Sequence, residues 1–158
     1  MSKNLNKKEI EKFSRQIILK NIGATGQKKI LSSKVLIVGM GGLGCPVAEF
    51  LTRSGIGTLG IADHDTVSLS NIHRQSLYNE KDINQSKVKI AKKELNKINP
   101  KTKIDIFNLK LNKTTFEKII KNYDYIVDGT DNFESKFLIN DLSPVSYTHL
   151  TLPTKDSV

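Results

Sequence analysis

The sequence has no tryptophan, a single cysteine and only 6% aromatic residues among its 158 positions. One cysteine excludes an internal disulfide framework and any multi-cysteine zinc site built from this chain alone. No apolar run approaches the roughly 20 residues that span a bilayer, and the lysine-rich start lacks the apolar stretch of a signal peptide. We therefore expect a cytoplasmic chain with one hydrophobic core and no membrane partner.

Arginine is also scarce, although the net charge is +9 from 25 basic and 16 acidic residues. Only Arg15, Arg53 and Arg74 are arginines, and the lysines are scattered without interleaved aromatic residues. Nucleic-acid surfaces need clustered cations. We interpret the charge as a compositional bias towards lysine, asparagine and isoleucine, and expect no nucleic-acid partner. A non-catalytic nucleotide-binding adaptor or a lysine-rich nucleic-acid binder is the alternative.

This bias stops abruptly near the C-terminus. Residues 143–158 contain no isoleucine, no asparagine and one lysine, and residues 145–154 read VSYTHLTLPT. The codons of a transposase library adapter would encode this string. We predict that 143–158 is a non-native tail, that 1–33 is an N-terminal helical segment and that 34–142 is an incomplete domain. A natural tail rich in proline, threonine and serine is the alternative.

The N-terminal segment has a helix start signal. Asn6 and Glu9 have the spacing of a capping box, in which each side chain bonds the other's backbone N–H. The helix that follows is expected to bury one face, formed by Ile10, Phe13, Ser14, Ile17 and Ile18. Arg15 points away from this face, which by spacing alone indicates a solvated arginine. A shorter helical turn is expected at 24–31.

From residue 35 the pattern alternates between strands and helices. Short apolar runs predict strands, at 35–38, 58–62, 104–107 and 125–127. Segments of helical pattern lie between and after them. One follows the glycine-rich turn, passes through Val47, Ala48, Phe50 and Leu51 and ends at Gly55 as C-cap, and the others lie at 87–98, 114–120 and 132–142. This alternation predicts a Rossmann-like α/β fold, an open and mostly parallel sheet with helices on both faces, preceded by the N-terminal helix.

A glycine-rich turn follows the first strand. Gly39, Gly41 and Gly44 form G-x-G-x-x-G, and Gly42 adds a fourth glycine. The backbone of such a turn can approach phosphate oxygens, and the following helix offers unpaired N–H groups. Asp63, at the end of the second strand, is placed to accept hydrogen bonds from ribose hydroxyls. These features predict a nucleotide site, but they suit an NAD-binding oxidoreductase domain as well as an ATP enzyme.

Five sequence blocks separate these alternatives. In chain order they are FSRQIIL, GMGGLG, the D-x-D-x-V-x-x-S-N-x-x-R-Q block, QSKV and DGTDN. Together they resemble the ThiF/MoeB/HesA family of ubiquitin-like-protein activating enzymes, over residues 13 to about 142. The resemblance implies ATP-dependent adenylation of the C-terminal glycine of a ubiquitin-like sulfur carrier of the thiamine or molybdopterin type. Residues 34–142 are then an incomplete ATP-binding domain.

The resemblance also implies roles for individual residues. The catalytic residues would be Arg15, Arg74, Lys87 and Asp131. The nucleotide-binding residues would be Gly39, Gly41, Gly42, Gly44, Asp63, Ser70, Asn71, Arg74, Gln75, Lys87, Asp131 and Asn132. Asp131 would hold Mg²⁺, which needs only one or two carboxylates beside phosphate oxygens and water. In the family, the arginine that matches Arg15 reaches the ATP of the partner in a homodimer.

Several of these residues have plainer interpretations. Asn71 suits a turn, Lys87 an exposed helix surface and Asp131 a helix cap. Cys45 starts a helix, where a lowered thiol pKa is conceivable, but we interpret it as a small buried packing residue. In the loop after the second strand, Asp65 is interpreted as a residue that orders the loop, and His64 and His73 are interpreted as loop residues rather than ligands.

The chain also lacks parts that full members of the family have. They continue with further strands, a crossover loop, two C-x-x-C pairs for structural Zn²⁺ and, in some, a sulfur-handling cysteine. Zn²⁺ is therefore expected only in the missing C-terminal half. The strand at 125–127 is expected to be an unpaired edge prone to association. We expect the chain as written to be unstable or poorly active, and its longer parent to adenylate.

Overall fold

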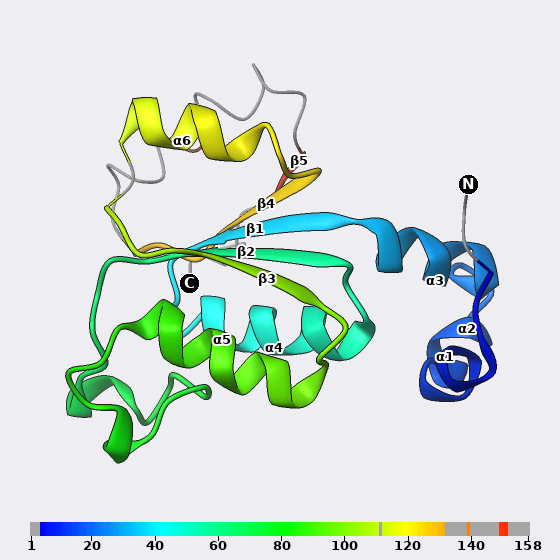
Figure 1. Cartoon of the computed structure of the whole chain (residues 1–158), viewed down its shortest axis with the longest axis horizontal. Helices are drawn as coiled ribbons and strands as arrows, with labels where there is room; N and C mark the ends of the chain where they lie inside the picture. The colour runs from blue at the N-terminus through cyan, green and yellow to red at the C-terminus, as the bar shows by residue number, and fades with distance from the viewer. Residues whose placement is uncertain (1–3, 111, 132–138, 140–148, 152–158) are drawn as a thin grey trace, which may run out of the picture.

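The computed structural model describes residues 4–110, 112–131, 139 and 149–151. Its centre is a parallel sheet with the spatial order β3-β2-β1-β4-β5 (Figure 1). The strands are β1 (Lys34–Val38), β2 (Thr58–Ala62), β3 (Lys103–Phe107), β4 (Tyr125–Asp128) and β5 (His149–Thr151). The chain first extends the sheet on one side of β1 and then returns to add β4 on the other side, so the strand order reverses next to β1.

Helices cover both faces of the sheet, as expected. Figure 1 shows α4 (Gly44–Ser54) and α5 (Lys87–Ile98) on one face and α6 (Lys113–Ile120) on the other. The successive β1 side chains Leu36 and Ile37 belong to separate buried clusters, because neighbouring strand residues point to opposite faces. Among the described residues no helix is long and apolar enough to cross a bilayer. The Rossmann-like fold class is confirmed.

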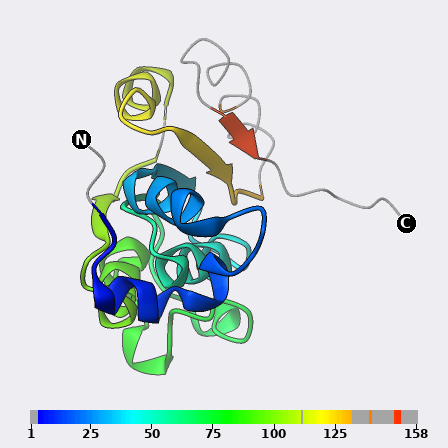
Figure 2. The same ribbon diagram turned by 90° about the vertical axis from the view of Figure 1, so that its right-hand side faces the viewer.

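The first helix expected in the N-terminal segment is split in two, whereas the helical turn expected at 24–31 is confirmed as α3 (Gly23–Ser32). The helices of this segment are α1 (Lys7–Lys12), α2 (Ser14–Ile17) and α3, which Figure 2 shows from their own side of the molecule. The predicted capping box between Asn6 and Glu9 is confirmed, with both hydrogen bonds at 3.0 Å.

The prediction that this segment buries its apolar face is wrong. Phe13 alone is buried, against the left-handed Gly55 that ends α4, whereas the side chains of Ile10 and Ile18 are 49% and 70% exposed. The helix breaks at Phe13, and docking that one ring fixes both short helices. An amphipathic face is buried only where another element covers it.

The expected unpaired edge at β4 is also wrong. β5 pairs with β4 in parallel, with Tyr125 opposite His149 and Val127 opposite Thr151. A parallel ladder uses backbone groups, so an extended segment can complete it whatever its origin. β5 lies inside the segment predicted to be a non-native tail, and that origin stays a prediction. The helix expected at 132–142 lies outside the described residues, apart from buried Ile139.

The loop between β2 and α5 is compact rather than irregular. It contains two short 3-10 helices, η1 (Leu69–Asn71) and η2 (Glu80–Asp82). An antiparallel bridge between Thr66 and Ser86 closes the loop at its base. Three of its apolar side chains are buried in the core beside α4 and α5: Val67, Leu77 and Tyr78. The loop is therefore a rigid support for the polar residues on its inner side.

Candidate nucleotide-binding site

A cavity of about 620 Å³ lies at the carboxyl ends of the strands. It opens beside β1, where the strand order reverses, which is the usual ligand position in open α/β sheets. The residues that line it come from the turns after β1, β2, β3 and β4 and from the start of α5. The fold thus places five separated stretches of sequence around one space.

The glycine turn shapes the wall of this cavity. Gly39 has a φ of +90°, and a Cβ there would lie 2.8 Å from the carbonyl carbon of Gly129. A Cβ on Gly44 would collide with the carbonyl oxygen of Gly39. Gly41 and Gly42 line the cavity itself, whereas Gly44 lies behind the turn and does not. Gly39 and Gly44 therefore set the path of the backbone, and the other two leave room for a ligand.

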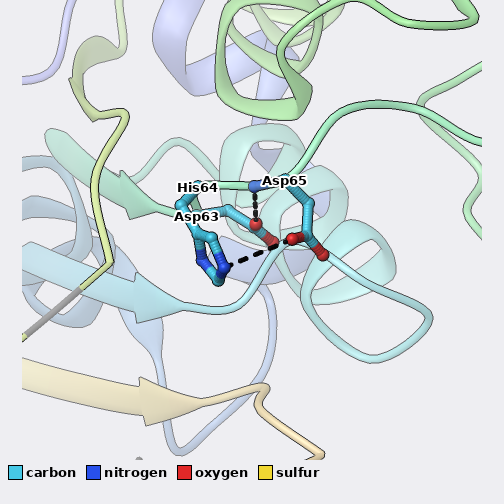
Figure 3. A group of neighbouring side chains, drawn as sticks. All are labelled: Asp63, His64 and Asp65. Carbon is cyan, nitrogen blue, oxygen red and sulfur yellow. Dashed lines mark hydrogen bonds and ion pairs between the residues drawn. The ribbon is translucent and has the colours of Figure 1, made fainter.

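Asp63 joins the glycine turn to the end of β2. Its Oδ2 accepts from the backbone N–H of Met40 at 2.7 Å, and its Oδ1 accepts from the N–H of Asp65 at 2.8 Å. Figure 3 shows the Asp63 carboxylate below the Asp65 backbone nitrogen, with His64 on its other side. Each carboxylate oxygen accepts more than one hydrogen bond, so Asp63 keeps capacity for ribose hydroxyls.

Arg74 lies over the glycine turn. A Cβ on Gly42 would be 3.3 Å from Arg74 Cγ and Cδ, so the arginine stem rests on the turn. The carbonyl of Asn71 accepts from the N–H groups of Arg74 and Gln75, at 3.2 and 3.1 Å, and so fixes both residues to η1. Arg74 is exposed, whereas Gln75 is buried beside the cavity with no partner for its Oε1.

Lys87 contradicts the interpretation as a surface lysine. It is the first residue of α5, yet its side chain is 5% exposed and lines the cavity. Its Nζ donates to Oδ2 of Asp65 at 2.9 Å, and its backbone N–H donates to the carbonyl of Asp65 at 3.1 Å. A buried ammonium needs a counter-ion, which Asp65 supplies. Asp65 thus has a partner that spacing did not reveal.

The turn after β4 presents an exposed carboxylate. The N–H and hydroxyl of Thr130 both donate to Oδ1 of Asp128, at 2.9 and 2.6 Å, which fixes the turn. Asp131 follows in this turn and lines the cavity. An exposed carboxylate at the wall of the cavity fits the oxygen ligands that Mg²⁺ prefers. Asp128 keeps a buried Oδ2 without a hydrogen-bond partner.

A second group of acidic residues lies near the cavity, but it is less suited to bind a metal ion than Asp131 is. Ligand atoms of Asp63, His64 and Asp65 lie within 4.8 Å of one another (Figure 3). Both oxygens of Asp63 accept backbone N–H groups, and Asp65 is paired with Lys87 and, at 3.4 Å, with His64 Nε2. A cation here would have to displace an ammonium, so the group is better described as a loop-ordering network.

Some expected site residues lie elsewhere. Arg15 is exposed on α2 and does not line the cavity. Ser70 does not line it either, and its hydroxyl lies 3.0 Å from that of Ser68. Asn132 lies outside the described residues. The other predicted nucleotide-site residues all line the cavity except Gly44: Gly39, Gly41, Gly42, Asp63, Asn71, Arg74, Gln75, Lys87 and Asp131.

Sequence reasoning missed two further parts of the wall. Leu109 and Lys110 line the cavity from the turn after β3. Lys110 stands among many lysines and belongs to none of the quoted blocks, so composition hides it. The sequence feature that could have identified Lys110 is its position just after the carboxyl end of a parallel strand, where ligand-binding residues gather.

Cys45 is a packing residue rather than an activated thiol. It is fully buried at the start of α4, and burial raises the pKa of its thiol to about 11. Its Sγ lies 3.4 Å from the carbonyl oxygen of Met40, which also accepts from the Tyr78 hydroxyl at 3.0 Å. Burial raises the pKa of Tyr78 as well. The interpretation as a packing residue is confirmed, and the lowered pKa is wrong.

Comparison with known families accounts for this arrangement. The model of the ThiF family matches residues 13–149. The chain belongs to the ThiF family. The match runs from the buried Phe13 to the first residue of β5 and so includes every strand start and every turn that lines the cavity.

Curated members of the ThiF family are similar in sequence. The adenylyltransferase and sulfurtransferase MOCS3 of Dictyostelium discoideum is 44% identical over 137 residues, 87% of this chain and 32% of that protein. The sulfur carrier protein adenylyltransferase of Thermus thermophilus is 37% identical over 135 residues, 85% of this chain and 50% of its own length. The chain thus spans about a third to a half of the curated relatives that it matches.

Solved structures of the ThiF fold superpose closely. PaaA has a TM-score of 0.84 at 28% identity, covering 100% of this chain and 51% of its own. E. coli MccB with bound ATP has a TM-score of 0.75 at 30% identity, covering 80% of this chain and 38% of its own. The architecture seen here is therefore that of experimentally determined proteins of similar sequence.

Proposed function

We propose that this ThiF-family chain is part of an enzyme that adenylates the C-terminal glycine of a ubiquitin-like sulfur-carrier protein with ATP. The observation that carries the proposal is that one cavity gathers the glycine turn, Asp63, Arg74, Lys87 and Asp131. The names of the relatives from Dictyostelium discoideum and Thermus thermophilus, both adenylyltransferases, support it. The ATP complex of MccB supports a triphosphate as the nucleotide.

The reaction joins a carboxylate to AMP. An oxygen of the glycine carboxylate attacks the α-phosphorus of ATP, the bond to the β-phosphate oxygen breaks, and pyrophosphate leaves with its electron pair. Such a transfer needs positioning and charge neutralisation rather than a covalent enzyme intermediate. Arg74 suits bidentate binding of phosphate oxygens, and Lys87 supplies a compact positive charge. Asp131 would hold Mg²⁺, which neutralises phosphate charge when bound.

The proposed reaction requires partners besides this chain. The carrier is a ubiquitin-like sulfur-carrier protein, of the thiamine or molybdopterin type, and the parent protein is a homodimer. Arg15 supports the dimer, because it is exposed on α2 and does not line the cavity of its own chain. In the dimer it would reach the phosphates bound by the other copy. Structural Zn²⁺ belongs to the part of the parent that this chain lacks.

An NAD-binding oxidoreductase domain is the competing function. The glycine turn and Asp63 suit it equally, but it gives no task to Lys87 or Asp131. Thermal unfolding separates the two, because a ligand of the folded state raises its stability. We expect Mg-ATP to raise the melting temperature and NAD to leave it unchanged. The opposite result contradicts adenylation.

The activity itself is tested by exchange of labelled pyrophosphate into ATP in the presence of a sulfur carrier. The parent enzyme should exchange, and Arg74→Ala should reduce the exchange at least about 100-fold by removing a bidentate phosphate contact. Arg53→Ala is the matched control, because Arg53 is paired with Glu49 on the exposed side of α4. Equal losses in both variants would contradict the role of Arg74.

A further inference from the structure

The two side chains of the ion pair between Lys87 and Asp65 differ in their exposure to solvent. The side chain of Lys87 is 5% exposed and that of Asp65 is 52% exposed, although Nζ and Oδ2 are 2.9 Å apart. Moving the ammonium out of the protein would require the start of α5 to open. The carboxylate needs only a side-chain rotation to reach water. Any exchange of partners at this pair therefore moves Asp65 and leaves Lys87 in place.

The backbone of Asp65 is fixed at both ends. Its N–H donates to Asp63 Oδ1, as Figure 3 shows, and its carbonyl accepts from the N–H of Lys87. The bridge between Thr66 and Ser86 closes the loop immediately beyond it. Rotation of the carboxylate consequently leaves the loop and the lysine where they are. On the outer side, Oδ1 lies 3.4 Å from His64 Nε2, itself exposed.

The remaining surroundings of Lys87 are of mixed charge. The charged and titratable groups that line the same cavity are Asp63, His64, Arg74, Lys110 and Asp131. Cys45, from α4, is also close enough to interact electrostatically with Lys87. In the described structure the carboxylate of Asp65 is the group in hydrogen-bond contact with Nζ. A phosphate that takes over this N–H group competes with the carboxylate for the lysine.

We propose that Asp65 is a resident counter-ion that holds the ammonium of Lys87 in position until a phosphate group of the nucleotide displaces it. The ligand class is a phosphate-bearing nucleoside, so the proposal rests on the proposed nucleotide function. Asp65 is then a positioning residue that acts through Lys87. It also lowers the affinity for phosphate, because the carboxylate must give up the ammonium before phosphate binds and repels the phosphate afterwards.

Calorimetric titration with adenosine, AMP and ATP, without divalent cations, tests this exchange. The Asp65→Asn variant keeps an oxygen acceptor but loses the charge, so AMP and ATP should bind about fivefold tighter or more than to the unaltered chain. Adenosine, which has no phosphate, should bind within about twofold of the unaltered chain. Asp65→Glu restores the charge and should restore the original phosphate affinities.

Two further variants complete the design. Glu94→Gln removes a carboxylate that pairs with Lys97 on the exposed side of α5, so all three affinities should be unchanged. Asp65→Ser removes the same charge as Asp65→Asn and should give the same gain in affinity for AMP and ATP. This variant replaces Asp65→Asn if the asparagine variant does not fold.

The outcomes separate two kinds of failure. If the unaltered chain binds none of the three ligands, the proposed function and this proposal are both overturned. If it binds AMP and ATP but Asp65→Asn binds them equally or more weakly, the exchange is overturned and the nucleotide site stands. A change of the same size for adenosine as for AMP identifies Asp65 as a loop-ordering residue only, and it also overturns the proposal.

Discussion

The backbone N–H of Met40 donates a 2.7 Å hydrogen bond to Oδ2 of Asp63, and this bond ties the turn after β1 to the end of β2. A hydrogen bond to an ionised carboxylate is about twice as strong as one between neutral groups. Asp63 therefore has two tasks. It fixes the glycine turn, and it presents a carboxylate to the ribose that the proposed nucleotide would bring.

Replacing Asp63 by asparagine should affect both tasks. We expect the free energy of unfolding to fall by about 1–2 kcal/mol and ATP affinity by about tenfold. Urea unfolding and calorimetry measure the two effects. Asp124→Asn is the control, because Asp124 Oδ2 accepts from the N–H of Lys34 at the opposite end of the same sheet. It should lower stability without changing ATP affinity, and equal loss of affinity in both variants would be evidence against the site.

Lys87 should matter far more for activity than for stability. Lys87→Met keeps the length of the buried stem and removes the charge, while half-exposed Asp65 returns to water. Pyrophosphate exchange by the parent enzyme should fall at least about 100-fold, with a change in unfolding free energy below about 1.5 kcal/mol. Lys89→Met, on the exposed surface of α5, should retain full exchange. Full activity of Lys87→Met would remove the lysine from the mechanism.

Gly44 should tolerate no side chain. In Gly44→Ala the new Cβ collides with the carbonyl oxygen of Gly39, so the turn or the start of α4 must move. We expect a loss of about 2–4 kcal/mol in the free energy of unfolding, by the mechanism of overpacking. Gly26→Ala is the control, because its Cβ meets the side chain of Ile22 at 3.1 Å rather than a backbone atom. It should change stability by less than about 1 kcal/mol.

Cys45 should make stability depend on alkaline pH. Burial raises its pKa from 9.0 to about 11, so between these values the unfolded chain releases the proton and the folded chain keeps it. The unfolded state is then favoured, and the contribution of the thiol, present in full below pH 9, is lost as pH rises towards 11. The loss amounts to about 2–3 kcal/mol. Cys45→Ala should show a correspondingly shallower decline in urea unfolding between pH 8 and pH 10.5.

The parts of the site that sequence predicts well are those with local causes. Gly39 and Asp63 are expected at the ends of the first and second predicted strands, and parallel pairing of β1 with β2 brings their turns together. The apolar face of the N-terminal helix was predicted wrongly, because periodicity identifies a face and not the element that covers it. Phe13 packs against Gly55 and is buried, whereas the side chain of Ile18 remains exposed.

By itself the sequence determined the order of the strands and helices from β1 to β4, the glycine turn and the residue types that surround it. These depend on short-range rules: side-chain period, helix caps and the steric freedom of glycine. Only the tertiary structure decided which lysine is buried, because Lys87 resembles its neighbours until the loop after β2 folds back over α5. Burial and ion pairing are properties of chain segments brought together from a distance, and no local pattern contains them.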